Sequence, residues 1–217
     1  MRLVSLSARL RRSVLLAVPL ALAALVLDAP ACPCDVLLNE ILAGPGRDWN
    51  GDGAVSSRDD EWVEIVNTGS APVSLDGYLL SDTDSTFRYA FTGVLAAGAR
   101  RIVFGLEAVE WQRATGRTIS GLSLNNSGET VRLFLAMGAD TVMVDAYGYR
   151  SHEAVTDRAS GRRPDGGAWA LFDGLNVYTG SLEPVSTQCL PTPGAANQCG
   201  PTPAHPGTWG RLKATYR

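Results

Sequence analysis

The sequence predicts an all-β fold, an immunoglobulin-like β-sandwich with one long polar loop region. About seven short runs rich in β-branched and aromatic residues alternate with turn clusters, which is the strand count of such a sandwich. The 23 Gly and 12 Pro among 217 residues supply many turns. Within the expected domain only residues 107–114 have a helical pattern, so the sequence favours an all-β fold over a helical bundle.

The expected strands follow one another at the spacing of a sandwich and are separated by clusters such as Asn125-Asn126-Ser127-Gly128. They are Val36–Leu42, Glu61–Asn67, Val73–Ser81, Phe87–Phe91, Arg100–Phe104, Thr130–Leu135 and Thr141–Tyr147. The polar, Gly-rich stretch 151–187 is expected to form a long ordered loop that carries one edge strand, Ala168–Phe172.

The first 31 residues have the pattern of a cleaved secretory signal peptide. Four arginines precede an apolar run from Val14 to Leu27, and Ala29-Pro30-Ala31 forms a small-x-small processing site. The run is too short for a spanning helix, so no transmembrane span is expected in the mature chain. We therefore expect an exported protein, located in the periplasm, on the outer surface or in the medium. A lipoprotein acylated at Cys32 is the minority alternative.

The rest of the chain divides into three parts. Residues 32–199 are expected to form the sandwich domain, 200–207 a Pro-rich linker and 208–217 a short aromatic and basic tail. Trp209, Leu212 and Tyr216 of the tail would share one side of a short helix. The segment Trp209–Arg217 is either an uncharacterised tail or a tag read by sorting machinery or by a partner groove.

The four cysteines lie at the two ends of the mature chain, at Cys32, Cys34, Cys189 and Cys199. In an oxidising compartment an even number of cysteines predicts disulfides, although the pairing stays open. Zinc is disfavoured because the C-x-C and C-x9-C spacings differ from those of zinc sites.

Several blocks of sequence, in a fixed order, together resemble the lamin tail domain as it occurs in secreted bacterial proteins. The matching blocks are Leu38–Leu42, Asp60–Asn67, Val73–Asp82, Leu124–Val131 and Thr192–Asn197, and they extend over residues 36–199. The resemblance implies an immunoglobulin-like sandwich that serves as a binding or scaffolding module. The family is sometimes found beside nuclease or hydrolase domains, and because no such domain fits in this chain, we expect any partner enzyme to be separate.

The segment Asp48–Asp59 has the ligand spacing of an EF-hand calcium loop. Asp48, Asn50 and Asp52 stand at positions 1, 3 and 5 of this loop, and Gly53 stands at position 6. The predicted Ca²⁺ ligands at the later positions are the carbonyl of Ala54, Ser56 directly or through water, and Asp59, which Asp60 or Glu61 would replace or assist. The expected role of Ca²⁺ is structural, and the alternative is a polar connection that only makes turns.

Catalytic motifs are lacking, so an enzyme is not expected. His152 is the only histidine of the predicted domain, and we interpret it as a solvated loop residue. We interpret four carboxylates as outward-facing strand residues or turn formers, namely Glu40, Glu64, Asp82 and Asp84.

The net charge gives a further indication of the class of function. Removal of residues 1–31 leaves 15 basic and 21 acidic residues, which argues against nucleic-acid binding. The predicted function is a non-catalytic exported module that binds an unknown protein or cell-envelope partner. The alternative is an accessory or degenerate component of an extracellular hydrolase or nuclease system.

Overall fold

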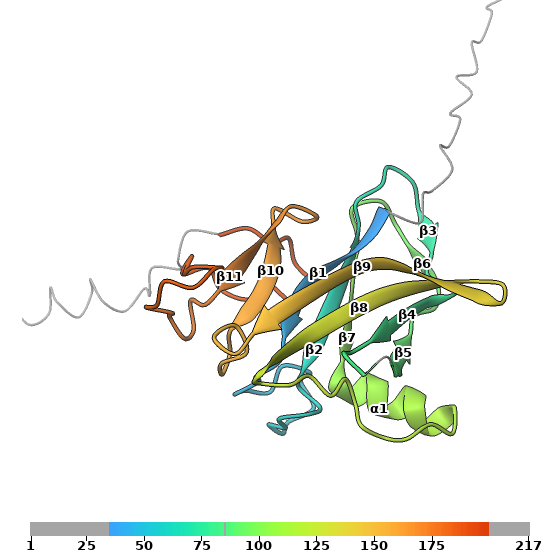
Figure 1. Cartoon of the computed structure of the whole chain (residues 1–217), viewed down its shortest axis with the longest axis horizontal. Coiled ribbons are helices and arrows are strands. Elements are labelled where there is room, and N and C mark those ends of the chain that lie inside the picture. The colour runs from blue at the N-terminus through green and yellow to red at the C-terminus, as the bar shows by residue number, and fades with distance from the viewer. Residues whose placement is uncertain (1–34, 85, 200–217) are drawn as a thin grey trace, which may run out of the picture.

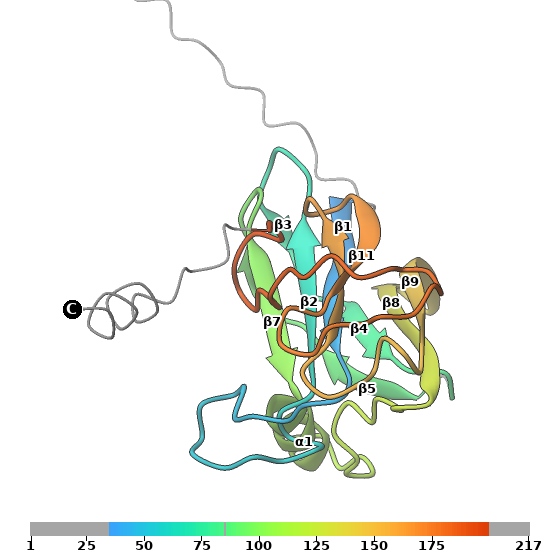
Figure 2. The same cartoon turned by 90° about the vertical axis from the view of Figure 1, so that its left-hand side faces the viewer.

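A computed structural model describes residues 35–84 and 86–199, which form two antiparallel sheets packed face to face (Figures 1 and 2). In spatial order the first sheet contains β11 (Ala168–Phe172), β10 (Ala159–Arg163), β1 (Val36–Leu42), β2 (Trp62–Asn67) and β7 (Arg100–Phe104). The second contains β5 (Phe87–Ala90), β4 (Tyr78–Ser81), β8 (Gly128–Met137) and β9 (Asp140–Arg150). A small ribbon pairs β3 (Val73–Ser74) with β6 (Val94–Leu95). The predicted all-β sandwich is confirmed.

The predicted strands mostly coincide with the observed ones, with three main differences. The short strand β6 was not predicted. The run Val73–Ser81 is broken into β3 and β4 by a turn in which Gly77 has a φ of 93°, a conformation that favours glycine. Strand β10 lies inside the segment that we expected to be a loop, and it pairs with β1 at Glu40 and Ile41. Strand β11 is the edge strand predicted at Ala168–Phe172.

Apolar side chains from the facing sides of both sheets fill the space between them. Leu38 and Ile65 contribute from the first sheet, and Leu80 and Leu133 contribute from the second, all at 2% exposure or less. A smaller cluster on the other side of the first sheet contains Leu42, Trp62, Ala159, Phe172 and Cys189. Strands β1 and β2 are therefore buried on both faces, as their burial patterns show.

The exposure predicted for three carboxylates is wrong. Glu40 and Glu64 are fully buried and Asp82 is 4% exposed, whereas Asp84 is exposed in a turn as expected. Alternation of polar and apolar residues placed Glu40 and Glu64 on a solvent face of the sheet. That face is instead covered by the segment 192–197, whose backbone amides at Thr192 and Gly194 donate to the two carboxylates.

Helix α1 (Gly105–Ala114) begins directly after β7, two residues earlier than predicted. Its start packs against the β1–β2 connection, because the amides of Gly105 and Leu106 donate to the carbonyls of Glu61 and Asp59. A Cβ atom at residue 105 would lie 1.8 Å from the carbonyl oxygen of Arg58. Glycine is thus required here for close approach of two backbones.

Substitution of Gly105 by alanine tests this contact against helix propensity. Propensity alone predicts a gain in stability of about 1 kcal/mol. We expect Gly105→Ala to lower the free energy of unfolding by about 1–3 kcal/mol, because the new methyl group overpacks against the Arg58 carbonyl. Urea denaturation measures the change. The exposed helix substitution Glu110→Ala is the control and should shift stability by less than about 0.5 kcal/mol; a more stable Gly105→Ala protein would contradict the contact.

Candidate functional site

The segment Asp48–Asp59, with its EF-hand spacing, lies in the connection between β1 and β2, which we call the calcium-like loop. This loop extends from one end of the sandwich, beside α1 (Figures 1 and 2). Its tip is open to solvent, since Asp48 and residues 51–55 are exposed. Its base is buried, since Ala43, Gly44 and Asp60 are inaccessible. The loop is therefore an exposed tip held on a fixed base.

Two carboxylates fix that base. The Asp60 carboxylate accepts hydrogen bonds from the amides of Trp49 and Asn50 through one oxygen, at 2.8 and 3.0 Å, and from the Ser56 amide through the other, at 2.7 Å. Asp157 accepts from the Gly46 amide and the Trp49 indole, both at 2.9 Å. Each carboxylate satisfies several backbone or ring N–H groups that would otherwise be costly to bury.

The structure brings the first three predicted ligands together at the tip. The amide of Asp52 donates to both Asp48 and Asn50, at 3.1 and 2.9 Å. Asp48 also accepts from the amides of Gly51 and Gly53, whose φ angles of 75° and 92° allow the tight turn. The Asp52 carboxylate accepts from the Ala54 amide at 2.8 Å. The chain at the tip is therefore wound around the side-chain oxygens at positions 1, 3 and 5.

The later predicted ligands are oriented differently. The Ser56 hydroxyl accepts from the amides of Arg58 and Asp59, so it stabilises a turn. The Asp59 carboxylate pairs with the Arg58 guanidinium at 2.9 Å. Within residues 35–84 and 86–199, no three acidic, histidine or cysteine side chains form a metal-binding group.

Asp157 was not identified from the sequence as part of this region. It lies 110 positions after Arg47, with which it forms an ion pair at 3.1 Å. No local motif marks it, and the one unusual local feature, its positive φ of 56°, is a property of the folded chain. Asp60, considered as a substitute for Asp59, is instead the buried anchor of the loop.

A second polar site is buried where segments far apart in sequence meet. The Asn39 side-chain amide donates to Glu64 at 2.8 Å and to Asp165 at 2.9 Å. The Asn39 carbonyl accepts from the Asn197 side chain at 3.1 Å, and Asp165 pairs with Arg100. We call the set Asn39, Glu40, Glu64, Arg100, Asp165, Thr192 and Asn197 the Asn39 network.

Burial changes the acidity of this network. Desolvation raises the pKa of Glu40 to about 8, although hydrogen bonds from Thr192 oppose the rise. Desolvation likewise raises the pKa of Glu64. Asp165 has a lowered pKa, because the Arg100 guanidinium and the Asn39 amide outweigh its burial. In this network, Asp165 is therefore the partner of the Arg100 cation, whereas Glu40 and Glu64 resist ionisation.

The disulfide of the described residues joins Cys189 and Cys199, whose Cα atoms are 4.9 Å apart. It closes a loop of ten positions around the segment 192–197, which includes Thr192 and Asn197 of the Asn39 network. Cys32 and Cys34 lie outside the described residues, as do the predicted signal peptide 1–31, linker 200–207 and tail 208–217.

His152 is half-buried rather than solvated. Its ring lies 4.7 Å from that of Tyr178, and neither ring nitrogen has a hydrogen-bond partner among the residues that the structure describes. The carbonyl of His152 accepts from Arg158, which also lies over Tyr178. The described surroundings of His152 thus consist of packing contacts and one backbone hydrogen bond.

Comparison with known proteins adds one match. The family model described as Lamin Tail Domain matches residues 30–151. This range contains β1–β9, α1 and the calcium-like loop, and it ends before β10, β11 and the segment 192–197. No curated protein matches the chain significantly.

The raised pKa of Glu40 predicts a loss of stability at alkaline pH. The folded protein binds this proton more tightly than the unfolded chain, whose carboxyl has a pKa of 4.5. The contribution is complete below about pH 4.5 and disappears as the pH rises through about 8, so the Tm should fall by several degrees between pH 5 and pH 9. Glu61, with a pKa raised by burial to about 8, acts in the same direction.

The variant Glu40→Gln isolates the contribution of Glu40, because glutamine stays neutral across this range. Its Tm should depend less on pH than that of the wild type, whatever its absolute stability. Glu110→Gln, on the exposed side of α1, is the matched control and should keep the wild-type slope. Equal slopes for all three proteins would show that Glu40 ionises normally in the fold.

Proposed function

Because the chain belongs to the lamin tail domain family, we propose that it acts as a non-catalytic binding or cell-surface scaffold module outside the cytoplasm. The family is a non-enzymatic immunoglobulin-like one, and the fold described above is such a sandwich. The observation that carries the proposal is the β1–β2 loop, a solvent-exposed tip on a base fixed by Asp60 and Asp157. A rigid base that displays an exposed loop is a common design of binding modules.

Export is proposed from the sequence of residues 1–31, and the disulfide supports it. Disulfides persist in oxidising compartments and are rare in the cytosol. The Cys189–Cys199 bond therefore suits a protein that works outside the cytoplasm. No helix among the described residues is long and apolar enough to cross a membrane. The basic and aromatic segment Trp209–Arg217 is proposed as a tag for sorting machinery.

We also propose that Ca²⁺ binds at the loop tip and has a structural role. Asp48, Asn50 and Asp52 would supply side-chain oxygens, and Ala54, Ser56 and Asp59 would complete the set, with the Asp59 carboxylate released from Arg58. Oxygen ligands from carboxylates, amides and carbonyls suit this hard cation. The cation would neutralise the charges of Asp48 and Asp52, which the described loop balances only with amide N–H groups.

Calcium should raise the Tm of the protein by a small and measurable amount. Extracellular sites bind with a Kd of about 10⁻⁴ to 10⁻³ M, so 1 mM Ca²⁺ would stabilise the fold by about 0.4–1.4 kcal/mol. This corresponds to a Tm increase of about 1–5 °C over the value in EDTA, measured by scanning calorimetry.

Variants of the loop locate the effect. Asp52→Asn should abolish the difference between Ca²⁺ and EDTA, whereas Asp140→Asn, at the exposed start of β9, should leave it unchanged. An identical Tm of the wild-type protein in EDTA and in millimolar Ca²⁺ removes calcium from the proposal.

Binding to the cell envelope tests the scaffold function directly. The purified protein should sediment with envelope fragments of its own cells, and the bound fraction should fall at least twofold in EDTA or with Asp52→Asn. Asp140→Asn controls for the loss of one carboxylate. A protein that stays in the supernatant under every condition contradicts the scaffold proposal, and equal sedimentation with and without EDTA contradicts only the role of calcium.

A further inference from the structure

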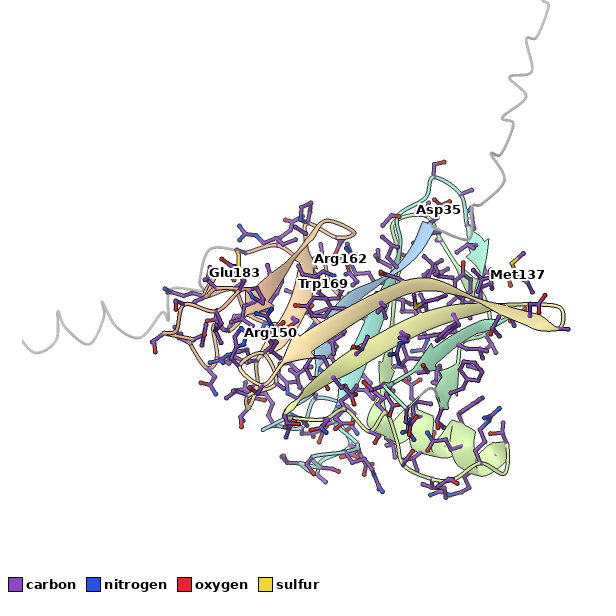
Figure 3. The ribbon with its side chains drawn as sticks, in the orientation of Figure 1. Asp35, Met137, Arg150, Arg162, Trp169 and Glu183 are labelled. Atoms are coloured by element: carbon purple, nitrogen blue, oxygen red, sulfur yellow. A yellow bond between two sulfur atoms is a disulfide. The ribbon has the colours of Figure 1, made fainter. Side chains whose placement is uncertain are left out.

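A small hollow opens where the edge strand β9 of one sheet meets the edge strand β11 of the other. It has a volume of about 270 Å³. Its lining consists of Tyr147, Gly148, Arg150, Glu153, Trp169, Glu183 and Pro184. Figure 3 shows Arg150, Trp169 and Glu183 together at this end of the sandwich, far from Met137 at the tip of the β8–β9 hairpin.

One wall of the hollow is aromatic and rigid. The rings of Tyr147 and Trp169 are stacked, with centroids 3.7 Å apart and planes inclined by 16°. The Arg162 guanidinium lies 4.8 Å from the Trp169 ring centroid and is held by both oxygens of Asp145, at 3.0 and 3.1 Å. Tyr147 and Trp169 are half-buried and both line the hollow, but stacking covers one face of each ring and Arg162 lies over Trp169, so only part of the aromatic pair remains exposed.

The floor is polar and fixed by Glu153. One oxygen of this buried carboxylate accepts from the Tyr147 hydroxyl at 2.5 Å and from the Ser160 hydroxyl at 2.6 Å. The other oxygen accepts from the Arg150 amide at 2.8 Å. These bonds hold the Tyr147 ring in place, so the wall needs little ordering when a ligand arrives.

The rim carries exposed charges of both signs. The Arg150 guanidinium uses one nitrogen to donate to the Glu183 carbonyl at 3.1 Å. Its Nε and second terminal nitrogen have no acceptor within the described part of the chain. The exposed Glu183 carboxylate accepts from the Val185 amide through one oxygen. The rim can therefore offer a ligand both N–H donors and a carboxylate acceptor.

We propose that this hollow binds one pyranose unit of a glycan. A sugar ring combines an apolar C–H face, which can pack against the exposed part of this aromatic pair, with a rim of hydroxyls that both donate and accept. Guanidinium and carboxylate groups bind such hydroxyls through charge-assisted hydrogen bonds. The volume of about 270 Å³ is slightly below the usual range for ligand sites, which suits one ring rather than an extended peptide.

The net charge of the mature chain favours a sugar over a nucleotide as the ligand. Both ligands contain a ring that stacks on aromatic side chains, but the mature chain has more acidic than basic residues, which disfavours phosphates. The inference rests on the proposed function, because it names the class of ligand that the binding module would recognise.

The test uses the purified protein and a panel of oligosaccharides of glucose, N-acetylglucosamine, mannose and galacturonic acid. The neutral and acidic members distinguish recognition of the ring from recognition of a charge by Arg150. We expect at least one member to shift the indole N–H signal of Trp169 in ¹H–¹⁵N spectra. Calorimetry should show affinity about tenfold weaker for Arg150→Ala, because charge-assisted hydrogen bonds are lost.

Matched variants separate the site from general effects. Trp169→Phe keeps an aromatic ring in the wall but should weaken binding at least threefold through lost contact area. Arg113→Ala and Trp111→Phe, both on α1, make the same changes elsewhere and should bind like the wild type. Thermal unfolding of each variant confirms that it is folded before binding is compared.

Three results would overturn the inference: no member of the panel binds at 10 mM, the Arg150 and Trp169 variants bind as well as the wild type, or only a proline-rich peptide shifts the Trp169 signal. Any of these, obtained with a protein that still sediments with envelope fragments, rejects the glycan site and leaves the scaffold function standing. A protein that binds sugar but does not sediment with envelope fragments would instead reject the scaffold function and leave the glycan site standing.

Discussion

The hydrogen bonds of Asn39 join the segments on which the rest of this domain depends. Its amide joins β1 to Glu64 of β2 and to Asp165 of the β10–β11 turn. The backbone carbonyl of the same residue binds Asn197, near the end of the described chain. An unsatisfied buried polar group costs about 1–3 kcal/mol, and more when it is charged, so these segments are stable mainly in each other's presence. The C-terminal segment is thus a structural part of the sandwich.

Charge balance explains how several carboxylates share so small a buried volume. Arg100 pairs with Asp165 and keeps its pKa low, whereas burial and the neighbouring carboxylates Glu64 and Asp165 favour a protonated Glu40. At neutral pH the network therefore contains fewer negative charges than carboxyl groups. Segment 192–197 supplies N–H and O–H donors to Glu40 and Glu64, and the Cys189–Cys199 disulfide holds the two ends of this segment together.

The local sequence pattern was sufficient to predict the strands in which polar and apolar residues alternate or strongly β-forming residues dominate. Val36–Leu42 and Arg100–Phe104 were predicted with their observed bounds, because such runs rarely form other structure. Strand β10 was missed because its sequence, Ala-Ser-Gly-Arg-Arg, contains no β-branched or aromatic residue, and it forms through pairing with β1 and β11. The burial of Glu40 was missed for a related reason, since its partner Thr192 lies 152 positions away. The carboxylate spacing of the loop tip was read from the sequence, whereas its anchor at Asp157 required the fold.

The way in which the loop is anchored limits what a cation at its tip can do. Asp60 and Asp157 hold the base through hydrogen bonds within the protein, so the fold of β1 and β2 does not require a metal. A structural metal in a small zinc domain differs, because it provides most of the folding free energy. Here binding would act on residues 48–54, most of which are exposed, mainly by neutralising the charges of Asp48 and Asp52. A weak site in this position would be filled at millimolar Ca²⁺ outside the cell and empty at micromolar concentrations, since occupancy follows the ratio of concentration to Kd. The loop tip would then gain this stabilisation only where Ca²⁺ is millimolar, while the sandwich itself would fold without the cation.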